Sequence, residues 1–112
     1  MPNFFVPLTD PPEDAEAVYA AFVRSHSIAI PPNAGRLFQI TFTDRGRILV
    51  AEVGREIRGF RENVGLVLGI VESGSLVSIH TERRNGPTTE AFLVSSDKIS
   101  SRRYFDDFPP RA

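Results

Sequence analysis

From Leu37 onward the chain is a succession of short apolar runs separated by turn residues, and this pattern limits its fold more than any other feature. In the segment 38–42, Phe, Ile and Phe alternate with polar residues at the two-residue period of a half-buried strand. The segment 44–46, Asp-Arg-Gly, then supplies turn chemistry. No helical segment separates the predicted strands, so the sequence favours an antiparallel meander over parallel βαβ units.

The same criteria locate the remaining strands. The tight turn Ser73-Gly74 joins two of them into a second hairpin, which is the strongest strand signal in the chain. The polar segment Gly54–Asn63, which contains Gly59 and Phe60, is predicted to leave the sheet. The predicted strands cover residues 37–43, 48–53, 64–72, 76–81, 91–94 and 100–105.

A single helix is predicted before the strands, from about Pro11 to Arg24. Asp10 suits its N-cap, and the acidic residues of the first turn favour the positive end of the helix dipole. Apolar residues recur at helical spacing and form one stripe that should pack on the sheet. The stripe consists of Ala15, Val18, Tyr19 and Phe22.

These elements define an α+β fold, with one N-terminal helix on a five- to six-stranded antiparallel meander. The strands 48–53 and 64–72 are apolar on both faces, so both faces need cover. One helix is about 10 Å wide and covers roughly two strands. A curled sheet, packing of the terminal aromatic residues over the sheet, or a homodimer interface would bury the rest.

We favour the curled sheet. The closing pattern is a strand, a short turn that ends at Ile99, and a final strand that contains Tyr104. This pattern resembles that of SH3-like small barrels, and the resemblance implies a fold and no particular function.

Length and composition predict one domain over residues 1–112, with an N-terminal arm at 1–9 and a C-terminal tail at 106–112. Apolar residues make up 41% of the chain and the net charge is −1, which is typical of a globular protein and favours neither nucleic acid nor membrane as a partner. The absence of cysteine excludes disulfides and thiol chemistry. It fits a reducing, cytoplasmic location.

No motif predicts catalysis, a metal or a cofactor. His80 and Glu82 share one face of a predicted strand, but a site would need a further ligand or partner, and none is identifiable. The other histidine, His26, is explained by its place at a helix end. Gly54, Gly59, Gly65 and Gly69 match no phosphate-binding motif and are interpreted as turn and bulge glycines.

The arginines are the best candidate binding residues, since 12 of the 13 basic residues are Arg. Coding bias in a GC-rich genome explains this preference as well as selection for phosphate or carboxylate binding does. Phe60 lies between Arg58 and Arg61, and an exposed ring there could stack on a nucleic-acid base. A loop anchored by one buried Phe is the competing interpretation. The candidate binding set is Arg58, Phe60, Arg61, Arg83 and Arg84.

The sequence therefore predicts a small non-enzymatic binding or accessory module. Its expected partner is another protein or a second copy of the chain, contacted through apolar sheet surface that the helix leaves uncovered. The alternative is a nucleic-acid-binding small barrel that uses the arginine-bearing loops. No cofactor, metal ion or membrane is expected as a partner.

Overall fold

A computed structural model of the chain describes residues 14–26, 36–61, 63–83 and 89–105. It confirms the α+β class, with one helix and an antiparallel sheet of seven strands. The elements are α1 (Ala15–His26), β1 (Leu37–Asp44), β2 (Arg47–Glu52), β3 (Glu56–Phe60), β4 (Asn63–Ser73), β5 (Leu76–Arg83), β6 (Thr89–Ser95), the 3₁₀ turn η1 (Ser96–Lys98) and β7 (Ile99–Tyr104).

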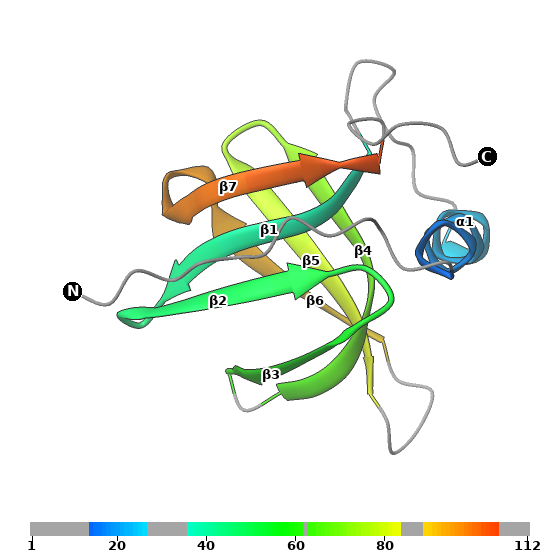
Figure 1. Cartoon of the computed structure of the whole chain (residues 1–112), viewed down its shortest axis with the longest axis horizontal. Coiled ribbons are helices and arrows are strands. Elements are labelled where there is room, and N and C mark those ends of the chain that lie inside the picture. The colour runs from blue at the N-terminus through cyan, green and yellow to red at the C-terminus, as the bar shows by residue number, and fades with distance from the viewer. Residues whose placement is uncertain (1–13, 27–35, 62, 84–88, 106–112) are drawn as a thin grey trace.

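The sheet curls into a half-barrel (Figure 1). Its main order is β2-β1-β4-β5-β6, while β3 pairs with β4 and β7 pairs with β1. The curl turns at residues 53–55, between β2 and β3, where the hydrogen-bonding partner of the chain changes from β1 to β4. Val53 N donates to Phe38 O of β1 and Gly54 N donates to Val67 O of β4, each at 2.8 Å. One bent segment, β2 followed by β3, thus joins the two halves of the sheet. The finer SH3-like arrangement stays a prediction.

The strand β3 corrects the prediction that residues 54–63 leave the sheet. Ile57 pairs with Gly65, and a register shift between Arg58 and Phe60 marks a β-bulge. Gly59 occupies this bulge with φ of +75°, a conformation that glycine adopts without steric cost. The bulge allows both Ile57 and Phe60 to be buried although they are three residues apart. The prediction was wrong because the bulge breaks the alternation by which a strand is recognised.

The helix α1 packs against β4 with the predicted apolar stripe. Ala15, Tyr19 and Phe22 are buried, and Val18 packs at the edge of the core. The Phe22 ring lies over Gly69 of β4 and contacts the His80 ring on β5, with centroids 4.9 Å apart. The helix therefore covers the outer face of the half-barrel over β4 and reaches β5 at His80. The predicted cap residue Asp10 lies outside the described residues.

The core fills the inside of the curl. Residues 37–42 of β1 are buried on both faces, and the edges of this strand pair with β2, β4 and β7. The expectation that β2 is covered on both faces is wrong, since Ile48 and Val50 are 37% and 38% exposed. The N-terminal arm 1–9 and the tail 106–112 lie outside the described residues. Among those described, no helix is long and apolar enough to cross a membrane.

Candidate functional site

Phe60, the aromatic residue of the predicted binding set, lies in the core. It is fully buried at the end of β3, between Phe42 of β1 and Phe92 of β6. Both contacts are edge-on, with centroids 5.2 and 5.1 Å apart. The structure thus shows the loop anchored by a buried Phe, and the exposed ring that base stacking requires is absent at this position.

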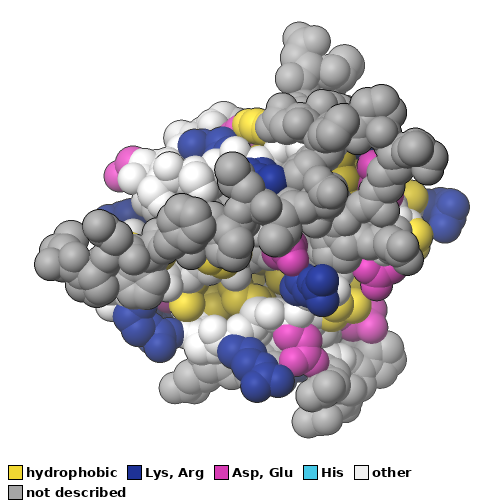
Figure 2. Space-filling model, in the orientation of Figure 1, with side chains coloured by type: hydrophobic (Ala, Val, Ile, Leu, Met, Phe, Trp, Pro, Cys, Tyr) yellow, Lys and Arg dark blue, Asp and Glu magenta, His cyan; other side chains and the backbone are white. Residues whose placement is uncertain are grey.

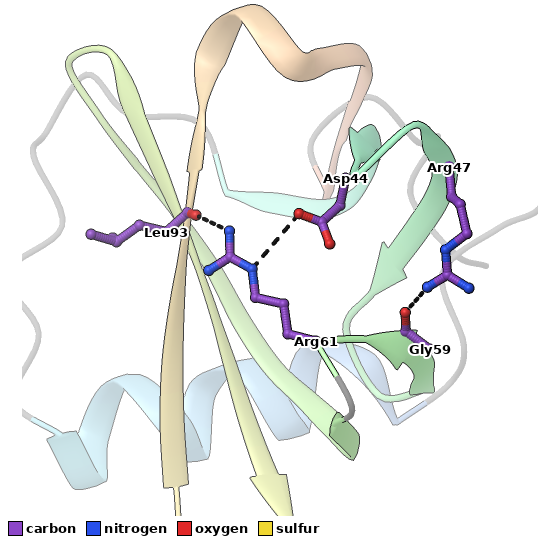
Figure 3. Close-up of polar contacts among 5 residues, drawn as sticks. All are labelled: Asp44, Arg47, Gly59, Arg61 and Leu93. Carbon is purple, nitrogen blue, oxygen red and sulfur yellow. Dashed lines mark hydrogen bonds and ion pairs between the residues drawn. The ribbon is translucent and has the colours of Figure 1, made fainter.

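Arg61 holds the β3–β4 turn against two other strands (Figure 3). Its Nε lies 3.7 Å from Asp44 Oδ1 at the end of β1, and its Nη2 donates to Leu93 O of β6 at 3.3 Å. The guanidinium also lies 5.1 Å from the centre of the Phe60 ring. Nearby, Arg47 of β2 donates to the Gly59 carbonyl. These contacts link β1, β2, β3 and β6 at the mouth of the half-barrel. Arg61 and Arg47 therefore have a structural role.

The other described arginines of the predicted set are paired locally. Arg58 lies 3.2 Å from Glu56, and Arg83 lies 2.9 Å from Glu90. Arg84 lies outside the described residues. Two further pairs, Arg55 with Glu52 and Arg102 with Glu72, repeat the pattern. On the face drawn in Figure 2, basic side chains stand apart from one another and several adjoin acidic ones, so they do not merge into one basic patch there.

His80 has a polar neighbour that the sequence interpretation missed. Ser78 Oγ lies 3.0 Å from His80 Nε2, with both side chains half-buried on the outer face of β5. The two residues are two apart on a strand, so their shared face was predictable, while their hydrogen bond was not. Groups of three or more metal-ligating side chains do not occur in the described part of the chain. The His80 ring also contacts the Phe22 ring of α1.

The largest exposed apolar side chains form two pairs, one on β2 and one across β5 and β6, at the two ends of the main sheet order. Ile48 and Val50 share the outer face of β2. Leu76 of β5 and Leu93 of β6 are more exposed, at 42% and 55%. Their register partners are Ser95 and Ser78, so the two leucines are diagonal neighbours across the β5–β6 ladder. We call Leu76 and Leu93 the leucine pair.

The leucine pair lies on the same face of the sheet as α1. Along β5, Val77, Ile79 and Thr81 are buried inside the curl, so Leu76, Ser78 and His80 point outward. The helix reaches this face at His80 through Phe22 and leaves Leu76, four residues away, exposed. The sequence predicted uncovered apolar sheet surface, and the structure identifies residues on which that surface lies.

No known protein family, characterised protein or solved structure matches this chain.

Proposed function

We propose that the protein is a non-enzymatic protein-interaction module whose contact surface is the outer face of β5 and β6, centred on the leucine pair. The observation that carries this proposal is the exposure of Leu76 and Leu93 beside a helix that covers only the neighbouring part of the same face. Burying a fully exposed leucine side chain contributes about 1.5–3 kcal/mol, and since Leu76 and Leu93 are each about half exposed, burying the rest of both contributes about that amount in total.

The surroundings of the leucine pair fit a protein partner. Ser78 and Ser95 lie opposite the leucines, and Ala91 is exposed next to Leu93 along β6. An apolar centre with a polar rim is the usual arrangement of a protein–protein contact. None of these side chains carries a charge that a partner would have to desolvate.

The alternative, a nucleic-acid-binding barrel, has less support. Arg58, Arg61 and Arg83 each contact a carboxylate, which lowers the net positive potential available to a phosphate backbone. Phe60 is buried, so the arginine-bearing loop contributes no described aromatic ring on which a base can stack.

The test is capture of host proteins by the immobilised chain and by two matched double variants. The Leu76→Glu and Leu93→Glu double variant places two negative charges on the proposed surface. The Ile48→Glu and Val50→Glu double variant is the control, because it places the same charges on the exposed outer face of β2. All four positions are exposed, so each double variant should melt near the wild-type temperature. The proposal predicts a protein that is retained by wild type and by the β2 variant and lost by the leucine variant. Retention by the leucine variant contradicts it.

A further inference from the structure

We infer that the partner at this surface is a second copy of the chain, joined by antiparallel pairing of β6 with β6 into one continuous sheet. This inference rests on the proposed function, because it places the contact at the leucine pair. It adds the backbone edge of β6 to the surface and fixes which residues of the two copies meet.

Among the strands at an edge of the described sheet, β6 carries the fewest charges and has no bulge, and Arg61 contacts its edge at the Leu93 carbonyl. Four strands pair with one described neighbour each: β2, β3, β6 and β7. Natural sheets protect such edges with charges, bulges or proline. Strand β7 carries Arg102 and Arg103, β3 is short and bulged, and β2 begins with Arg47. In contrast, β6 has Glu90 as its only charge and pairs with β5 over seven residues without a register shift.

The hydrogen-bond pattern shows which backbone groups of β6 face this edge. Ser96 N donates to Ser75 O, which makes Leu76 and Ser95 a non-hydrogen-bonded pair. Because hydrogen-bonded and non-hydrogen-bonded pairs alternate, the backbone N–H and C=O of Leu93 also point away from β5. The Leu93 carbonyl accepts a hydrogen bond from the Arg61 side chain. The backbone groups of residues 89, 91, 93 and 95 thus point outward. Arg61 contacts one of these carbonyls, and a carbonyl oxygen can accept two hydrogen bonds.

Two copies of β6 are complementary about a two-fold axis through Phe92, the middle residue of the strand. In an antiparallel ladder, the backbone groups of two directly opposite residues must both point toward the partner strand or both point away from it. This axis places Leu93 opposite Ala91 of the second copy, and the backbone groups of both residues point outward. A large side chain then meets a small one, and the two Leu93 side chains become diagonal neighbours.

The charges are also compatible with this pairing. Glu90 of the second copy lies opposite Val94, so the two Glu90 side chains do not face each other. Each Glu90 also keeps its own partner, because its carboxylate lies 2.9 Å from Arg83 of the same chain. Stable complexes bury roughly 1,200–2,000 Å² of surface in total. An interface made of one strand edge and one leucine pair from each copy buries less than this, so the dimer should be weak and reversible.

The test is sedimentation of the full chain over a concentration series, with variants at Ala91 and Leu93. Ala91→Pro deletes an outward N–H and leaves the β5 ladder intact, whereas Ala91→Ser keeps that N–H. One hydrogen bond lost from each copy should weaken dimerisation about 30-fold in Ala91→Pro and little in Ala91→Ser. Equal association of wild type and a folded Ala91→Pro variant overturns the inference.

A charge exchange at Leu93 keeps the test decisive if Ala91→Pro fails to fold. Leu93→Glu and Leu93→Lys should each sediment as monomers, because like charges meet diagonally at the axis. An equal mixture of the two should associate again, and a mixture that stays monomeric overturns the inference. A wild-type chain that stays monomeric also overturns it; leucine-dependent capture of a different protein would then leave the proposed function standing.

Discussion

The ring of Phe22 lies directly over Gly69, so a Cβ on that glycine would come within 2.4 Å of two ring carbons. Real Cβ atoms do not approach this closely, and the absence of a side chain at residue 69 is what lets α1 lie flat on β4. This contact sets how closely α1 approaches β4 on the outer face of the sheet, the face on which the leucine pair also lies.

Gly69→Ala should destabilise the fold by about 1–3 kcal/mol, because the new methyl group and the Phe22 ring compete for the same space. In a Phe22→Ala background the same substitution should cost much less, since the ring is gone. Urea unfolding of the wild type, both single variants and the double variant measures this coupling. Additive effects would show that the Phe22–Gly69 contact does not position α1.

Phe60→Ala should lower the free energy of unfolding by about 3–5 kcal/mol, as expected for a large cavity in the core. Phe60 is fully buried between Phe42 and Phe92, so its loss removes contacts between β1, β3 and β6. Phe60→Leu, which keeps most of the apolar volume, is the control and should cost about 1.5 kcal/mol or less. Equal stability of Phe60→Ala and wild type would contradict the core position of this ring.

Arg58 and Arg61 should respond differently to replacement by alanine. The Arg58 side chain is 73% exposed and pairs with Glu56, so Arg58→Ala should change stability by about 0.5 kcal/mol or less. Arg61 contacts Asp44, the Leu93 carbonyl and the Phe60 ring, so Arg61→Ala should cost about 1–2 kcal/mol. Thermal melts compare the two variants. A larger loss in Arg58→Ala would contradict the structural role of Arg61.

The fold was largely predictable from residue patterns. The stripe of α1 and the alternation of β1 and β5 are local signals, and each of these elements appears in the structure. Strand β3 was not predicted because its two buried residues, Ile57 and Phe60, sit on either side of a bulge. A glycine with polar neighbours resembles a loop when only sequence spacing is considered.

The roles of the candidate site residues depended on distant partners and could not be predicted. Arg61 contacts residues 17 and 32 positions away in the sequence, and no local pattern indicates such pairing. The exposure of Leu93 likewise depends on which part of the outer sheet face α1 packs against. The sequence indicated a surplus of apolar sheet surface, while the three-dimensional packing determines which residues remain exposed.

Tyr19 should make stability sensitive to alkaline pH. Burial raises the pKa of its hydroxyl above the ordinary value of 10.0, and the nearby positive charge of Arg36 lowers this pKa by a smaller amount. The folded state thus binds the Tyr19 proton more tightly than the unfolded state does. This contribution is fully present below pH 10 and is lost as the pH rises through the folded-state pKa.

Urea titrations of wild type and Tyr19→Phe at neutral pH and at about pH 11 test this linkage. The wild type should lose more stability than Tyr19→Phe over that interval, because only the wild type must ionise the buried hydroxyl. Parallel losses in the two proteins would show that Tyr19 does not titrate differently on unfolding.

The central claim is that the chain binds protein through the outer face of β5 and β6, and capture from nuclease-treated and untreated host lysate tests it most directly. We expect the tagged wild-type chain to retain a discrete protein, or an untagged copy of itself, in both lysates. The Leu76→Glu and Leu93→Glu double variant should lose that protein. Recovery of nucleic acid, with all retained protein lost after nuclease treatment, would contradict the claim and favour binding through the arginine-bearing loops.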